Sequence, residues 1–123
     1  MKYTIELKNC AFFARHGVFN EEETLGQRFF VDAHLTVDGG DALEKDEIAG
    51  TVDYGAAFGV ISAIVTGERY YLIEALALKT AQSLCSEFPQ VTDARVAIRK
   101  PNAPVQGILD TVEVSVHWSA QRP

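Results

Sequence analysis

The sequence predicts an α+β domain in which two helices cover one face of an antiparallel four-stranded sheet. Three observations lead to this prediction: residues 29–38 alternate between apolar and polar, residues 53–87 repeat apolar positions at helical spacing, and the alternation returns after residue 94. The element order is therefore ββααββ, with both pairs of strands in one sheet. The 123 residues suit one domain, residues 1–123, because single domains are about 100–200 residues long.

The strands are predicted from apolar residues at every second position. In residues 4–14, Ile5 and Leu7 share one face, and the alternation slips near Asn9, which predicts a β-bulge. The inward positions of the other strands are Phe29, Val31, Ala33, Leu35 and Val37, then Ala94, Val96, Ile98 and Lys100, and last Val112, Val114, Val116 and Trp118. The turn residues of 38–41 and 101–107 predict loops.

Two helices are predicted between the two pairs of strands. Asp53 can cap the first helix, which spans residues 53–66 and ends at Gly67. The second helix spans residues 72–87 and ends at the Phe88-Pro89 pair. The predicted apolar stripes are Phe58, Ile61, Ile64 and Val65 in the first helix, and Ile73, Leu76, Ala77, Thr80 and Leu84 in the second.

The face of the sheet that the helices leave open is predicted to be polar. Its residues are Asp32, His34, Thr36, Glu113, Ser115 and His117. A short sheet with two free edges suits a ring or barrel built from several copies, because closure removes the exposed edges. We therefore predict a homo-oligomer, and the alternative is a monomer whose polar face is solvated.

Composition argues against several classes of function. The net charge is −6, from 11 basic and 17 acidic residues, so we expect no nucleic-acid partner. We expect no membrane span, which needs roughly 20 apolar residues, and no signal peptide. Cys10 and Cys85 stand far apart without a CxxC pattern, which is typical of reduced thiols in a cytoplasmic protein. His16, His34 and His117 are not spaced as metal ligands, so we expect no metal or cofactor.

Three side chains could carry chemistry. Lys100 shares the inward phase of its strand and precedes Pro101, so its ammonium group either extends to solvent or faces a cleft. Glu74, in the first turn of the second helix, either complements the helix dipole or accepts N–H donors from a planar heterocycle. Tyr54 is either a surface aromatic or a ring that stacks on a ligand. The acidic run 21–23 is predicted to be a solvated turn, in which the charge pattern selects no residue.

Several segments stand in an order and spacing that are typical of one enzyme family. They are residues 16–22 (HGVFNEE), 25–29 (LGQRF), 51–55 (TVDYG), 67–69 (GER), 72–77 (LIEALA) and 99–104 (RKPNAP), followed by Gly107 and Asp110. Over about residues 4–117, the chain resembles the dihydroneopterin aldolases of folate biosynthesis. The resemblance implies the tunnelling fold, with tetrameric β-barrel rings that usually stack as octamers and with active sites between subunits.

The resemblance also implies a lyase that cleaves 7,8-dihydroneopterin by a retro-aldol reaction to 6-hydroxymethyl-7,8-dihydropterin and glycolaldehyde, with epimerisation to dihydromonapterin as a second activity. The pterin ring takes up the electrons of the broken bond, so neither a Schiff base nor a metal is implied. The implied catalytic residues are Lys100 as the general acid/base acting through water, Tyr54 as the ring that packs on the pterin and helps to protonate the intermediate, and Glu22. Glu22 and Tyr54 would come from one subunit, and Lys100 from its neighbour.

The residues that the resemblance implies for substrate binding are Glu22, Val52, Tyr54, Ile73 and Glu74. Glu74, on the same subunit as Lys100, would hold the 2-amino group and N3 of the pterin. The backbones of Ile73 and Val52 would add contacts at the same edge.

Two alternatives stay open. One is a dihydroneopterin triphosphate epimerase on the same fold, although the turn at 16–17 and the loop at 100–104 favour the aldolase. The other is a ring-forming protein that binds a pterin or purine without catalysis. Release of glycolaldehyde from dihydroneopterin separates the aldolase from both.

Overall fold

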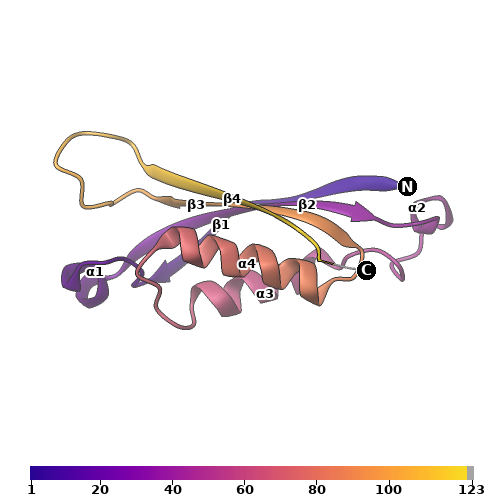
Figure 1. Ribbon diagram of the computed structural model, residues 1–123, viewed down its shortest axis with the longest axis horizontal. Helices are drawn as coiled ribbons and strands as arrows, with labels where there is room; N and C mark the ends of the chain where they lie inside the picture. The colour runs from indigo at the N-terminus through magenta and orange to yellow at the C-terminus, as the bar shows by residue number, and fades with distance from the viewer. Residues whose placement is uncertain (122–123) are drawn as a thin grey trace.

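The computed structural model describes residues 1–121 and contains one four-stranded antiparallel sheet with helices on one side (Figure 1). The strand order is β1-β2-β3-β4, and each neighbouring pair is antiparallel. In chain order the elements are β1 (Lys2–Ala14), α1 (Asn20–Leu25), β2 (Gln27–Asp38), α2 (Ala42–Lys45), α3 (Tyr54–Val65), α4 (Ile73–Glu87), β3 (Val91–Lys100) and β4 (Val112–Ser119). The predicted α+β class and ββααββ order are confirmed. Residues 122–123 of the predicted domain lie outside the described part of the chain.

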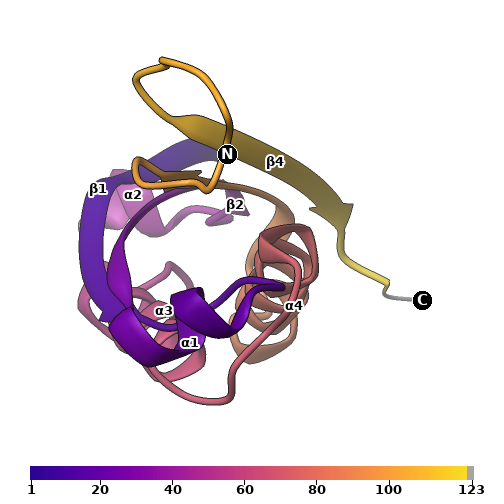
Figure 2. The ribbon, with the colours of Figure 1, turned by 90° about the vertical axis from the view of Figure 1, so that its left-hand side faces the viewer.

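The sheet curls around α3 and α4, which both lie on its concave face (Figure 2). The short helices α1 and α2 lie at opposite ends of the sheet (Figure 1). The pairing of β1 with β2 shifts register between Leu7 and Cys10, and Asn9 there has a φ of 56°, so the predicted bulge is confirmed. β1 and β4 are the edge strands of the sheet.

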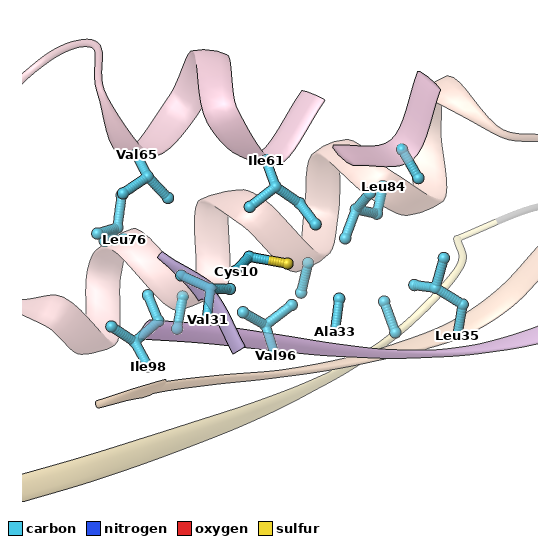
Figure 3. Packing of buried hydrophobic residues seen from close by; sticks show 14 of the residues in the cluster. Cys10, Val31, Ala33, Leu35, Ile61, Val65, Leu76, Leu84, Val96 and Ile98 are labelled. Atoms are coloured by element: carbon cyan, nitrogen blue, oxygen red, sulfur yellow. The ribbon is translucent and has the colours of Figure 1, made fainter. Parts of the chain in front are cut away.

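The hydrophobic core fills the space between the concave face and the two long helices (Figure 3). The predicted inward residues of β2 and β3 are buried, whereas those of the edge strand β4 are half-buried. The predicted stripe of α4 is buried throughout. The stripe of α3 differs, because Ala57, Ile61 and Val65 are its buried residues and Phe58 is 42% exposed. Phe58 instead packs on the edge of the core, with its ring 5.6 Å from that of Phe12.

The N-terminus of α3 is capped as the sequence predicts. The Asp53 carboxylate accepts hydrogen bonds from the backbone N–H groups of Gly55 at 2.9 Å and Ala56 at 3.3 Å. These bonds satisfy donors that the first turn of a helix leaves unpaired. Among residues 1–121, no helix combines the length and apolar character that crossing a membrane requires.

The acidic run 21–23 forms part of helix α1, so the prediction of a simple turn is wrong. All three glutamates lie in the first turn, where negative charge complements the helix dipole. Glu22 Oε1 also accepts a hydrogen bond from the backbone N–H of Phe19 at 3.3 Å. The helix is only six residues long, which is too short for side-chain periodicity to reveal it.

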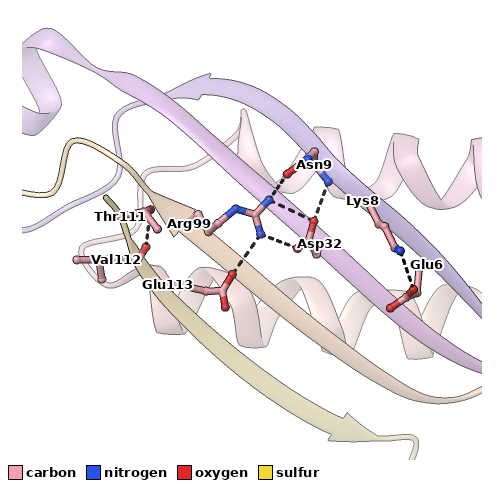
Figure 4. A network of polar contacts seen from close by, with 8 residues as sticks. All are labelled: Glu6, Lys8, Asn9, Asp32, Arg99, Thr111, Val112 and Glu113. Carbon is pink, nitrogen blue, oxygen red and sulfur yellow. Dashed lines mark hydrogen bonds and ion pairs between the residues drawn. The ribbon is translucent and has the colours of Figure 1, made fainter. Parts of the chain in front are cut away.

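The open face of the sheet carries a hydrogen-bonded cluster centred on Arg99 (Figure 4). The guanidinium donates to Asp32 at 2.5 Å, to Glu113 at 3.1 Å, and to the side-chain carbonyl of Asn9 in the bulge. Hydrogen bonding to Arg99 lowers the pKa of Asp32, and the same bonds raise the pKa of Arg99. The Arg99 side chain thus links all four strands. Arg99 directly precedes Lys100, the last residue of β3.

Candidate active site

Lys100 ends β3 and points away from solvent, to the helix-covered side of the sheet. The residue is 8% exposed, and its Nζ lies 2.5 Å from Glu22 Oε2. The ammonium group also lies 5.9 Å from the centre of the Phe29 ring. Of the two predicted orientations, the structure therefore shows the one that faces a cleft, and a carboxylate lies beside it.

Glu22 is the partner that the sequence did not single out by its own charge pattern. It too is 8% exposed, so the ion pair is withdrawn from water on both sides. Desolvation of two charges is costly, and removing one partner of such a buried pair typically destabilises a protein by about 3–5 kcal/mol. The implied division of residues between subunits is wrong for Glu22, because it lies with Lys100 in the same chain. The reason is that residues 15–19 connect β1 to α1 and bring α1 beside the end of β3.

The pair lies at a groove of about 310 Å³ between α1, the start of α4 and the loop after β3. Ile73 is buried in its wall, and Glu74 is exposed at the first turn of α4. The remaining lining is mainly apolar and consists of Val18, Phe19, Tyr71, Leu72, Ala103, Pro104, Val105, Val112 and Val114. The groove therefore offers two carboxylates and one ammonium group among apolar surfaces, which suits a flat, polar heterocycle.

Tyr54 and Val52 lie elsewhere. They line a second cavity, of about 670 Å³, together with residues of α2 and with Tyr3 and Ile5 of β1. Within residues 1–121, no residue lines both this cavity and the groove beside Lys100. Val52 is buried, whereas the Tyr54 side chain is 68% exposed. The structure therefore brings four of the six predicted site residues together within one chain and leaves two at the other cavity.

His16 joins the segment after β1 to the connection between α3 and α4. Its Nδ1 accepts the backbone N–H of Tyr70 at 2.9 Å, and its Nε2 lies 2.7 Å from the carbonyl oxygen of Val65. This pattern fits a neutral ring with its proton on Nε2. Burial lowers the pKa of His16, which favours the neutral form. In the sequence, His16 belongs to the 16–22 motif and lacks the spacing of a metal ligand, and neither feature indicates this structural position.

The apolar lining of the groove was also missed. Phe19, Tyr71 and Leu72 are exposed, at 53%, 67% and 51%, and all three lie beside predicted site residues. Large apolar side chains in loops next to Glu22 and Glu74 were the available signal. Among residues 1–121, no group of three or more histidine, cysteine or acidic residues is placed to hold a metal ion.

Comparison with known proteins identifies the family. The family model described as dihydroneopterin aldolase matches residues 5–117. A dihydroneopterin aldolase of Streptococcus pyogenes serotype M18 is 41% identical over 112 residues, which cover 91% of this chain and 94% of the relative.

Solved structures agree with the sequence matches. The Escherichia coli dihydroneopterin aldolase in complex with neopterin superposes with a TM-score of 0.84 at 22% identity, covering 95% of this chain and 99% of that one. A dihydroneopterin aldolase from Burkholderia thailandensis bound to guanine has a TM-score of 0.76 at 25% identity, covering 98% and 93%. The chain therefore belongs to the dihydroneopterin aldolase family and has the aldolase activity that the family is named for.

Proposed function

We propose that the buried Lys100–Glu22 pair is the centre at which 7,8-dihydroneopterin is cleaved. The observation that supports this role is the ammonium group held 2.5 Å from a carboxylate at a groove whose walls are otherwise mainly apolar. Such a pair can hold a proton, pass it to a water, and take it back, which is what an acid/base catalyst needs. Residues 1–123 act in this proposal as one catalytic domain.

The proposed reaction begins when Lys100, through a water, removes the proton of the C2′ hydroxyl of the side chain. The C1′–C2′ bond then breaks and glycolaldehyde leaves. The electron pair of that bond moves through C1′ into the C=N5 unit of the pterin, which is protonated at N5. Proton delivery to C1′, with Tyr54 assisting, and loss of the N5 proton to water then restore the C=N5 bond and give 6-hydroxymethyl-7,8-dihydropterin. Because the substrate supplies the electron sink, this route uses neither a Schiff base nor a metal.

Glu74 and Ile73 are proposed to recognise the pyrimidine edge of the pterin. A carboxylate can accept two parallel N–H donors, here the 2-amino group and N3, and the backbone of Ile73 adds a contact. The neopterin and guanine of the two related structures both contain a 2-amino-4-oxopyrimidine ring, which supports this assignment. Glu22 is proposed to contact the hydroxylated side chain, because it lies at the Lys100 end of the groove.

A second copy of the chain is proposed to complete the site. Tyr54 and Val52 line a cavity that shares no residue with the groove, so they reach a substrate beside Lys100 only from a neighbouring subunit. The open polar face and the edge strands β1 and β4 suit closure of several sheets into a barrel. We infer a tetrameric ring, stacked as an octamer, that works in the cytoplasm and also epimerises its substrate to dihydromonapterin.

Product analysis tests the proposed route. Purified protein is incubated with 7,8-dihydroneopterin in the presence of a chelator, and glycolaldehyde and both pterin epimers are quantified. We expect equal amounts of glycolaldehyde and 6-hydroxymethyl-7,8-dihydropterin, with or without chelator, and a smaller amount of dihydromonapterin. Inactivation by borohydride only in the presence of substrate would indicate a Schiff base and contradict the route. Formation of the epimer alone would favour an epimerase.

A further inference from the structure

Arg69, in the loop between α3 and α4, holds the segment that connects β1 to α1. Its Nε donates to the carbonyl oxygen of Arg15 at 3.0 Å, and its Nη2 donates to those of Gly17 at 2.6 Å and Phe19 at 3.2 Å. The Arg69 side chain is only 20% exposed, so water competes weakly for these bonds. A planar guanidinium with several fixed N–H donors is suited to satisfying three acceptors at once.

The segment that Arg69 holds also cradles the carboxylate of Glu22. The backbone N–H of Phe19 donates to Glu22 Oε1, and the other oxygen, Oε2, accepts from Lys100. Gly17 has a φ of +141°, and a Cβ placed there would lie 2.2 Å from the carboxyl carbon of Glu22. The carboxylate therefore rests directly against the α-carbon of Gly17, in space that only glycine leaves open.

We propose that Arg69 is a positioning residue that fixes the Glu22 carboxylate against Lys100 through the backbone of residues 15–19. Arg69 does not line the groove, so it acts through this backbone and not on the substrate. The proposal rests on the proposed catalytic role of Lys100 and Glu22. Without Arg69, the remaining hydrogen bonds described between this segment and residues 65–70 are the Gly17–Tyr70 backbone bond and the two bonds of His16. A displacement of about 1 Å in a catalytic group can cost about 100-fold in rate.

The first test compares Arg69→Gln with Arg69→Lys, and uses Arg95→Gln on the open face as the control. We expect kcat for glycolaldehyde release to fall about 100-fold in both Arg69 variants, whereas the affinity for 6-hydroxymethyl-7,8-dihydropterin changes little. Lysine keeps the positive charge near Glu23, 3.6 Å from Arg69, but cannot reach three carbonyls in the same geometry. Rescue by lysine would show that charge alone matters and would overturn the proposal.

A double-mutant cycle separates positioning from general stability. If Arg69 acts through Glu22, then Arg69→Gln in a Glu22→Ala background should lower kcat by no more than about threefold. Equal effects of Arg69→Gln in both backgrounds would overturn the proposal. Loss of folded protein in both Arg69 variants would also overturn it, because Arg69 would then serve the stability of the whole chain. If Lys100→Met and Glu22→Ala themselves retain full activity, the proposed function fails instead, which is a separate result.

Discussion

The groove beside Lys100 and the cavity beside Tyr54 lie in the same chain but differ in completeness. At the groove, an ion pair of two buried residues is held by hydrogen bonds from the same chain. At the cavity, Tyr54 is 68% exposed. The groove is built from α1 and the start of α4, whereas the cavity is built from α2 and the start of α3. The groove is thus preorganised within one chain, whereas the cavity is the surface that we propose a neighbouring subunit completes.

This difference explains how a chain of 123 residues can build a site for a bicyclic substrate. A small domain has room for one modest core, and here that core fills the space between the sheet and the helices. In the proposed assembly, the charged groups of the groove and the aromatic ring of Tyr54 meet across a subunit interface. The following predictions test this division, from the largest expected effect to the smallest.

Replacing Lys100 with methionine should abolish the chemistry of the groove. We expect kcat for glycolaldehyde release to fall about 1,000-fold, because general acid/base catalysis contributes 10²–10⁴-fold. Lys79→Met, an exposed lysine of α4, is the matched control and should keep full activity. Loss of Lys100 also leaves Glu22 buried without its ammonium partner. Thermal unfolding should therefore be measured for Lys100→Met and for the double variant that carries both Lys100→Met and Glu22→Gln. Normal turnover in Lys100→Met would refute the assignment.

Mixing two inactive variants tests whether the groove beside Lys100 in one subunit meets the cavity beside Tyr54 in its neighbour. Lys100→Met damages the groove, and Tyr54→Ala damages the cavity. Mixed rings therefore contain some interfaces at which an intact groove faces an intact cavity. With random assembly of equal amounts, about one quarter of the sites should be complete. Activity is measured after co-expression or joint refolding. A mixture no more active than the average of its parents would show that Tyr54 does not complete the groove of a neighbour.

Glu74→Ala should weaken substrate binding and leave the chemistry largely intact. Hydrogen bonds to a charged group contribute enough that KM should rise about 30-fold. Because Glu74 is exposed in the first turn of α4, its loss should change the melting temperature little. Glu87→Ala at the other end of the helix is the control. A fall in kcat with constant KM would mean that Glu74 acts in catalysis and not in recognition.

Lowering the pH should weaken the contacts that His16 makes with Val65 and Tyr70. Burial lowers the pKa of His16 in the folded protein, so the unfolded chain binds a proton first as the pH falls. His16 therefore favours folding fully above about pH 6.5, and this contribution is progressively lost at lower pH. Urea unfolding at several pH values between about 7 and 5 measures the slope. His16→Gln should flatten the slope, and an unchanged slope in this variant would contradict the prediction.

The fold could be predicted well from the sequence because its signals are local and periodic. Alternation in β2 and β3 and the stripe of α4 mark buried faces directly, and Asp53 marks the start of α3. The bulge near Asn9 was visible as a slip of phase. The two short helices α1 and α2 were not predicted, because four to six residues are too few to show helical spacing. Phe58 was predicted to lie in the buried stripe of its helix but is partly exposed. Helical periodicity indicates which face of a helix is buried, but not where the buried stripe ends.

The candidate site could be predicted only in part. Local pattern indicates Lys100, Glu74 and Tyr54 as candidates, and the resemblance to the aldolases selected Glu22. The assignment of Glu22 to a different subunit from Lys100 was wrong, because no local pattern shows that α1 lies beside the end of β3. The clamp of His16 and the three carbonyls held by Arg69 join segments about 50 positions apart, and nothing in either segment alone indicates the other.

The sequence by itself determined the sheet, its covered face, the two long helices and the reaction family, because hydrophobic period and short motifs act at short range along the chain. Only the tertiary structure decided which carboxylate lies beside Lys100 and that Tyr54 lies at a separate cavity. Those facts depend on contacts between distant segments, where direction and distance are set by the packing of the whole chain.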